Sequence, residues 1–323
     1  MRFVPDSAST ALASSELEVR LEQHRRELTG YCYRMLGSPF EAEDAVQETL
    51  LRAWRAHDRF EGRAALRSWL YRIATNVCVD SLKSRERRAR PMDLGPAREP
   101  LESNLHALPE VTWIEPIPDP ADEAVSRETI RLAFVAALQH LPPRQRAVLI
   151  LCEVLRWKAS EVAELLETSV ASVNSALQRA RATIEAIDLA DAPPTAAEAD
   201  PELLARYVAA FEAYDMDALT SLIHEDATQS MPPFDLWLSG RADILEWWVG
   251  PGGGCRGSRV IPTVAANGAP AFGQYKPSAT GDGYEPWALQ VIEVEDGRIV
   301  ELTFFLDTER VFPLFGLPPR LER

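Results

Sequence analysis

Cysteine is scarce in this sequence of 323 residues, which holds only Cys32, Cys78, Cys152 and Cys255. The four are scattered and have neither the paired spacing nor the nearby histidines that a zinc site requires. Free, mostly buried thiols are typical of a reducing cytoplasm. We therefore expect a cytoplasmic protein with no metal and no cofactor.

Long apolar segments are also missing. No apolar run approaches the roughly 20 residues that a membrane-spanning helix needs. The first residues do not show the basic-then-apolar order of a signal peptide. These absences predict that the protein is not a membrane protein.

Positive charge is in deficit, with 34 Lys and Arg against 49 Asp and Glu, a net charge of -15. Such a balance would argue against nucleic acid, but it is uneven along the chain. Basic residues outnumber acidic ones by 15 to 12 in residues 12–90 and by 7 to 5 in residues 131–187, whereas residues 91–130 and 188–323 are strongly acidic. Because salt screens exposed charges beyond about 8 Å, a local basic face can still bind phosphate.

The most informative stretch is residues 68–90, which we predict to be one helix with two faces. Apolar residues recur at helical spacing from Trp69 to Leu82 and predict a buried stripe. The opposite stripe is polar and runs into further arginines before Pro91. A run of charges taken alone is as often a helix face exposed to solvent as a binding surface. This one has the spacing to follow a phosphate backbone. Its candidate contact residues are Arg72, Asn76, Lys83, Arg87 and Arg88.

Two further helices are predicted before this stretch, over residues 16–36 and 41–55, followed by a loop over residues 57–66. We expect Trp54 to face inward with the other apolar residues of the second helix. Its outer face carries acidic residues early and basic residues late, which also complements the helix dipole. The outward candidates are Asp44, Gln47, Glu48 and Arg52.

A proline-rich, acidic segment over residues 91–122 lacks periodicity and is predicted to be a linker without its own core. Helices are predicted over residues 123–140 and from there to about Leu155. A short helix capped by Ser160 and a final helix over residues 172–187 follow, an order typical of a helix-turn-helix. The outward residues of the final helix are Ser172, Asn174, Ser175, Gln178, Arg179 and Arg181.

Two stretches resemble the group IV, or extracytoplasmic function, sigma factors of bacterial RNA polymerase. The first joins DAVQETLLRAW, residues 44–54, to RSWLYRIATNVCVDSLKSRERR, residues 67–88. The second is residues 141–182, from LPPRQ to QRARA. The resemblance implies a region 2 helical bundle over residues 12–90 and a region 4 helix-turn-helix over residues 123–188.

The resemblance also implies partners, namely core RNA polymerase and promoter DNA, and leaves an anti-sigma factor open. The face with Asp44 would dock on the clamp helices of the largest subunit, and region 4 would lie near the flap. The stripe with Arg72 would read and melt the -10 element, while the final helix would enter the major groove of the -35 element. Asn174 and Ala176 stand where the family commonly has Lys or Arg, so the promoter sequence cannot be inferred.

The remaining residues, 200–323, predict helices over 201–214, 216–223 and 240–248 and a hairpin turning at Asp296-Gly297. This order resembles a SnoaL-like domain of the NTF2 superfamily, as in the SigG-like subgroup of sigma factors. The expected fold is therefore multidomain: two all-α sigma domains plus a C-terminal α+β NTF2/SnoaL-like cone domain.

A cone of this kind encloses a pocket, so a small-molecule ligand is possible. Pocket candidates are Trp237, Trp247, Gln274, Tyr275, Trp287 and Gln290. An isomerase-like enzyme would need an acid and a base in that pocket, for which His224, Asp226 and Asp235 are candidates. We favour a domain that regulates the sigma factor in cis and is not an enzyme. The alternatives are a helix-turn-helix regulator that acts without polymerase and a sigma scaffold fused to an active enzyme.

Overall fold

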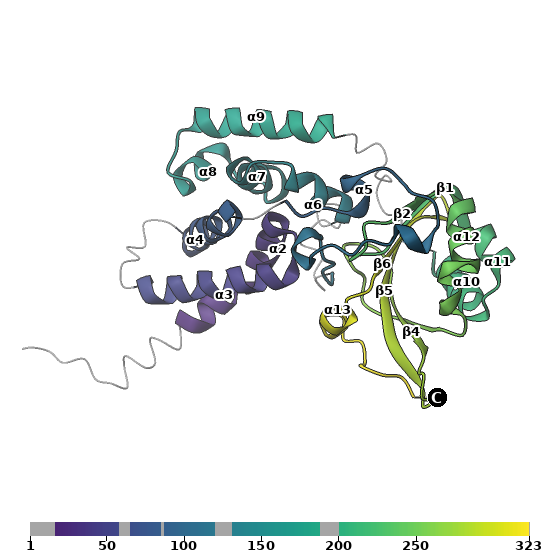
Figure 1. Cartoon of the computed structure of the whole chain (residues 1–323). Coiled ribbons are helices and arrows are strands. Elements are labelled where there is room, and N and C mark those ends of the chain that lie inside the picture. Colours follow the sequence, from purple (N-terminus) through teal and green to yellow (C-terminus); the bar gives the residue numbers. More distant parts are fainter. Residues whose placement is uncertain (1–16, 58–64, 85–86, 120–130, 188–199, 323) are drawn as a thin grey trace, which may run out of the picture. The chain divides into compact units, whose positions relative to one another are not determined.

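The computed structural model describes residues 17–57, 65–84, 87–119, 131–187 and 200–322 (Figure 1). The chain forms two compact units. The helical unit comprises residues 1–87 and 137–187, and the sheet unit comprises residues 88–136 and 188–323. None of the helices within the described ranges is long and apolar enough to cross a membrane.

The helical unit begins with a three-helix packing of α2 (Arg25–Leu36), α3 (Pro39–Ala56) and α4 (Leu66–Ser81). Gly37, with φ 76°, ends α2, and the Ser38 side chain caps α3 by accepting from the Glu41 amide. All three helices contact one another and bury side chains. The predicted helix over residues 16–36 is wrong as one element, because a turn at residues 23–24 interrupts it.

The helix predicted over residues 68–90 is also shorter than expected. α4 ends at Ser81 and is followed only by a 3-10 turn, Leu82–Ser84. Ala89 instead forms a parallel bridge with Trp113. Its backbone N–H donates to the Thr112 carbonyl, and its carbonyl accepts from the Ile114 amide. These distant backbone partners satisfy the groups that a longer helix would have paired, so the helix does not continue.

The second half of the helical unit begins at Ala137, within α6 (Leu132–Gln139). It continues with α7 (Pro143–Leu149), a π-helical turn (Ile150–Val154), α8 (Ala159–Leu165) and α9 (Val170–Ala186). Ser169 caps α9 through the Ser172 amide. The predicted cap at Ser160 is wrong, since α8 begins one residue earlier with Lys158 as its N-cap. The pair α8 and α9 forms the expected helix-turn-helix.

The sheet unit contains a six-stranded sheet in the order β2-β1-β6-β5-β4-β3, in which only β1 and β6 are parallel. The predicted hairpin turn is confirmed, because Asp296 and Gly297 both have positive φ and join β5 to β6. The strand bounds are β1 (Ile223–Ser230), β2 (Trp237–Ser239), β3 (Arg259–Pro262), β4 (Ala271–Pro277), β5 (Tyr284–Glu295) and β6 (Arg298–Phe305).

Helices α10 (Pro201–Ala213), α11 (Met216–Leu222) and α12 (Arg241–Val249) share one apolar core with this sheet (Figure 1). A last helix, α13 (Thr308–Leu314), follows β6. The arrangement is the α+β domain expected from the sequence.

The described part of the linker belongs to the sheet unit. It forms three short helical turns, α5 (Pro91–Leu94), η3 (Glu102–Asn104) and η4 (Glu110–Thr112). Isolated bridges pair Ala107 with Phe234 and Pro118 with Ala266. The segment that lacks a core of its own is therefore held on the surface of the C-terminal domain.

Candidate polymerase, promoter and ligand sites

The outer face of α3 presents the four side chains predicted to bind polymerase. Asp44, Gln47 and Arg52 are exposed, and Glu48 lies 2.6 Å from the Arg52 guanidinium one turn later. Leu51 and Trp54 are also 40% and 50% exposed, so the expectation that Trp54 faces inward is wrong. Large apolar side chains among charged ones are typical of protein interfaces.

Sequence reasoning missed Leu51 as a candidate. Leu51 lies four residues after Gln47 and therefore on the same face of α3 as the predicted charged residues. This spacing was the available signal.

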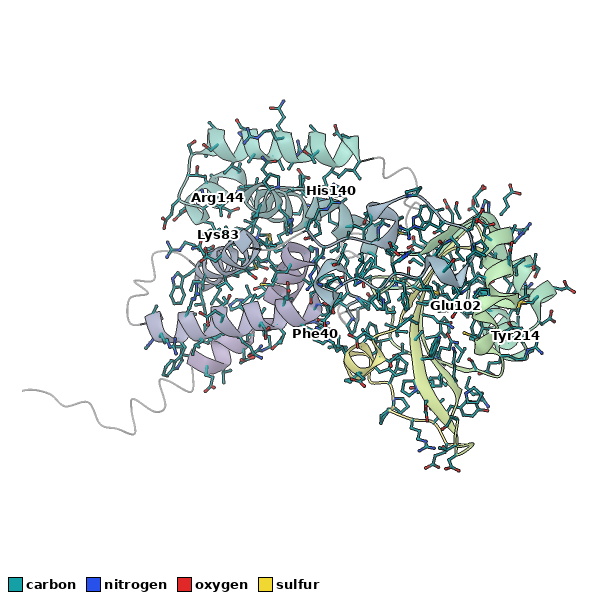
Figure 2. The ribbon with its side chains drawn as sticks, viewed as in Figure 1. Phe40, Lys83, Glu102, His140, Arg144 and Tyr214 are labelled. Atoms are coloured by element: carbon teal, nitrogen blue, oxygen red, sulfur yellow. The ribbon has the colours of Figure 1, made fainter. Side chains whose placement is uncertain are left out.

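The polar stripe of α4 is only partly free. Asn76 is exposed, but Arg72 lies 3.2 Å from Glu167 at the end of the helix-turn-helix turn. Lys83 pairs with Asp80 at 2.7 Å (Figure 2). Most of the predicted -10 side chains therefore already bind another side chain of the same unit. Of the predicted reading loop, residues 58–64 lie outside the described residues.

Arg87 and Arg88 have different environments. The exposed Arg87 guanidinium lies 2.7 Å from Nδ1 of His140. Arg88 is buried, donates to the carbonyls of Trp113 and Glu110, and lies 3.5 Å from the Glu115 carboxylate. The expectation that Arg88 faces DNA is therefore wrong for this arrangement, because the linker covers it.

A contact seam joins α4 to the turn before α8. The Tyr71 and Trp157 rings have centroids 5.1 Å apart, and the Arg67 guanidinium lies within 5.3 Å of both. The seam continues at Arg146, which is 3% exposed and donates to the Met35 carbonyl and to the Gln139 side chain. Burial lowers the pKa of Arg146 to about 10. The two halves of the helical unit are thus held together by buried polar bonds.

The recognition candidates on α9 are all exposed, as expected for a helix that enters a major groove. Arg181 differs from the other candidates, because its guanidinium donates to the carboxylate of Glu153 in the π-helical turn. Among the described residues none pairs with the exposed Arg179 side chain in this way. The exposed set is Ser172, Asn174, Ser175, Gln178, Arg179 and Arg181.

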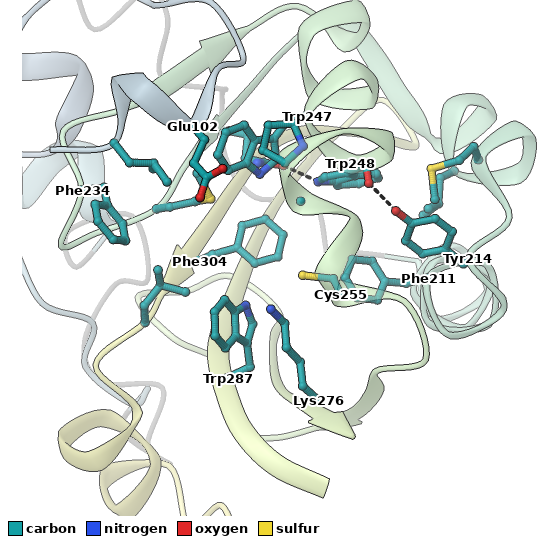
Figure 3. A pocket seen from close by; sticks show the side chains of 18 residues that line it. Glu102, Phe211, Tyr214, Phe234, Trp247, Trp248, Cys255, Lys276, Trp287 and Phe304 are labelled. Atoms are coloured by element: carbon teal, nitrogen blue, oxygen red, sulfur yellow. Dashed lines mark hydrogen bonds between the residues drawn. The ribbon is translucent and has the colours of Figure 1, made fainter. Parts of the chain in front are cut away.

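The sheet unit contains a cavity of about 270 Å³, lined mainly by aliphatic and aromatic side chains (Figure 3). Trp247 and Trp287 line it, as predicted. The other four pocket predictions are wrong, because their side chains lie elsewhere. They are Trp237, Gln274, Tyr275 and Gln290.

These four side chains are satisfied by other partners. Buried Gln290 accepts from Tyr207 and donates to Gln274, which donates to Ser258, all at 3.0–3.1 Å. Tyr275 donates to the Pro318 carbonyl. Trp237 donates to the Gly95 carbonyl at 2.8 Å and so binds the linker. Hydrogen-bonded amides of this kind stabilise the core and are not available to a ligand.

Family models match three segments of the chain: Sigma-70 region 2 at residues 21–88, Sigma-70 region 4 at residues 131–184 and a SnoaL-like domain at residues 204–302. The ECF RNA polymerase sigma factor SigG of Mycobacterium tuberculosis (strain H37Rv) is 46% identical over 319 residues, covering 95% of this chain and 85% of that protein. The chain belongs to the ECF sigma factors.

This sigma factor also resembles SigJ of M. tuberculosis, which is 30% identical over 87% of this chain and 88% of that protein. The crystal structure of SigJ matches with a TM-score of 0.60 at 22% identity, covering 94% of this chain and 99% of that one. The folds of the helical part and of the C-terminal domain are therefore shared with a solved sigma factor.

The residues weighed for an enzyme do not form a catalytic pair in this sigma factor. His224 and Asp226 are 42% and 86% exposed on β1, outside the cavity. Asp235 is bound by the Arg98 guanidinium at 2.9 Å. Isomerase chemistry needs its acid and base together in an apolar site, which these three residues do not provide.

Proposed function

We propose that this sigma factor binds core RNA polymerase through the outer face of α3, contacts the -10 element through α4 and enters the -35 element with α9. Its C-terminal domain would modulate initiation in cis. The observation that carries this proposal is the docking of the linker on the C-terminal domain, together with the exposed polar faces of α3 and α9. We further propose that it acts in the cytoplasm, where its polymerase is found.

The linker is held along most of its described length. Arg98 forms a two-point contact with Asp235, and the Leu108 amide donates to the Pro233 carbonyl at 3.0 Å. Farther along, the Ile117 amide donates to the Asn267 side chain. A linker with these bonds cannot at the same time extend through another protein. Its release would therefore be a step at which the C-terminal domain limits initiation.

A buried ion pair holds the start of region 4 in the same way. Arg131 directly precedes α6, and its guanidinium lies 2.6 Å from the Glu293 carboxylate on β5. Both side chains are about one-tenth exposed. The C-terminal domain thus contacts the chain on both sides of the undescribed residues 120–130.

The contact between Arg72 and Glu167 supports the same kind of control within the helical unit. The guanidinium that would bind promoter phosphate is occupied by a carboxylate of the helix-turn-helix turn. Promoter binding by α4 would have to break this pair. We infer that the arrangement described here is a closed state.

The test is run-off transcription with bacterial core polymerase, comparing the full chain with a chain truncated after Ala190. We expect specific initiation from both, with a higher yield from the truncated chain because its linker is no longer held. Equal yields would contradict modulation in cis. If neither form initiates while both bind promoter duplex alone, the regulator that acts without polymerase is the correct function.

Replacing Trp54 with alanine is expected to weaken binding to core polymerase by about 2 kcal/mol, roughly 30-fold, because exposed aromatic anchors dominate interface energies. Leu51→Ala should have a smaller effect in the same direction. The measurement is titration of fluorescently labelled core polymerase. Val249→Ala is the control, since Val249 is 62% exposed but lies on α12. Equal affinity of the Trp54 and Val249 variants would remove this face from the proposal.

Replacing Arg179 with alanine is expected to cost about 1–3 kcal/mol in binding to the -35 element if the side chain contacts a base. The loss should depend on the promoter sequence, whereas loss of a phosphate contact would be similar on all sequences. Footprinting of the polymerase complex on matched and mutated -35 elements measures it. An unchanged footprint would remove Arg179 from the recognition set.

A further inference from the structure

Two parts of the chain line the cavity in the sheet unit (Figure 3). One is the C-terminal domain itself, which contributes Trp247, Trp248 and Phe304. The other is the linker, which contributes Glu102 and Leu105 from the turn η3 and the residue after it. At about 270 Å³ the cavity lies a little below the roughly 300–1,000 Å³ of typical ligand pockets, so it suits a small ligand.

The cavity has one cationic side chain, Lys276 of β4. Its ammonium lies 3.0 Å from the centroid of the Trp287 ring and interacts with the Cys255 thiol. Burial lowers the pKa of Lys276, and Cys255 partly offsets this effect. Within the described ranges no carboxylate pairs with Lys276. A half-buried ammonium without an anionic partner is a site for an anionic ligand group.

The acidic side chain of the lining is well separated from this lysine. Figure 3 shows Glu102 on the far side of Phe304 from Lys276. The aromatic rings lie between these two ends. A ligand could thus place an anionic group at Lys276 without meeting the carboxylate of Glu102, while its apolar part packs against the rings.

We propose that this cavity binds a small aromatic carboxylate, with its ring among the tryptophans and its carboxylate on Lys276, and that the bound ligand stabilises the docked linker. The second part rests on the proposed modulation in cis. Because Glu102 and Leu105 complete the wall only while the linker is docked, the ligand has more contacts in that state. A ligand with higher affinity for one state shifts the population toward it.

The binding test uses calorimetric titration of the full chain with 2-naphthoate and with the neutral 2-naphthalenemethanol, which has the same ring system. We expect 2-naphthoate to bind at least tenfold more tightly. Lys276→Met should remove this preference and Lys276→Arg should retain it. Lys158→Met, which removes an exposed lysine of the helical unit, should leave it unchanged. Absence of binding, or a preference that persists in Lys276→Met, would overturn the proposal.

The coupling test follows the linker directly. Saturating 2-naphthoate should slow hydrogen exchange of the Leu108 amide, which bonds Pro233 when the linker is docked. Leu105→Ala should weaken 2-naphthoate binding severalfold, whereas Leu101→Ala, at an exposed linker position outside the cavity, should not. Unchanged exchange with bound ligand would overturn the coupling. The transcription result for the truncated chain is obtained without ligand, so it tests the modulation in cis separately.

Discussion

Replacing Glu293 with alanine is expected to lower the free energy of unfolding of the sheet unit by about 3–5 kcal/mol, the usual cost of breaking a buried ion pair by removing one partner. Its carboxylate lies 2.6 Å from Arg131, and both side chains are about one-tenth exposed. Removing it breaks the ion pair of a buried guanidinium. Urea unfolding followed by far-ultraviolet circular dichroism measures the loss.

The matched control is Glu246→Ala, which removes an exposed carboxylate from α12 and should change stability by less than about 0.5 kcal/mol. The double variant Arg131→Met, Glu293→Leu should recover most of the loss, because an apolar pair replaces the ion pair without leaving a buried charge. If Glu293→Ala costs no more than Glu246→Ala, the pair does not hold the start of region 4.

The ion pair also has a functional consequence if the proposed modulation is correct. Glu293→Ala should release Arg131, which directly precedes α6, and raise initiation toward that of the truncated chain. The double variant lacks the pair but keeps a packed contact, so it should initiate less than Glu293→Ala. Run-off transcription of these forms separates loss of the contact from loss of stability.

Local signals in the sequence predicted much of the fold. Gly37 and Pro39 mark the boundary between α2 and α3, and Asp296-Gly297 marks the β5–β6 turn, because each signal acts through the backbone conformation of its own residues. The exposed face of α9 followed from helical periodicity. These predictions depended only on neighbours within one turn, although the equally local N-cap assigned to Ser160 was wrong.

Several errors came from contacts between residues far apart in the sequence. α4 stops at Ser81, and Ala89 pairs with Trp113 through backbone groups, which carry no side-chain pattern. The bonds of Gln274 and Gln290 depend on strand register, which periodicity does not give. The pocket prediction for Trp237 was wrong because the residue type does not distinguish a side chain that lines a cavity from one that binds the linker.

Replacing Arg146 with methionine is expected to lower the free energy of unfolding of the helical unit by about 3 kcal/mol or more. Arg146 is 3% exposed and donates to the carbonyls of Met35, Gln139 and Leu141 and to the Gln139 side chain. Methionine fills a similar volume but removes these donors, at about 1–3 kcal/mol for each acceptor that neither water nor another donor then reaches. Thermal and urea unfolding measure the loss.

The same substitution tests the closed state, because the Met35 carbonyl lies on α2 whereas Arg146 lies on α7. Weakening this bond should favour separation of the two halves and free Arg72 from Glu167. Binding of a single-stranded -10 oligonucleotide to the protein without polymerase should then increase. Arg144→Met is the matched control, since Arg144 is exposed on the same helix (Figure 2) and should change neither stability nor binding. A destabilised Arg146→Met variant with unchanged oligonucleotide affinity would show that Arg146 supports the fold without keeping α4 from the promoter.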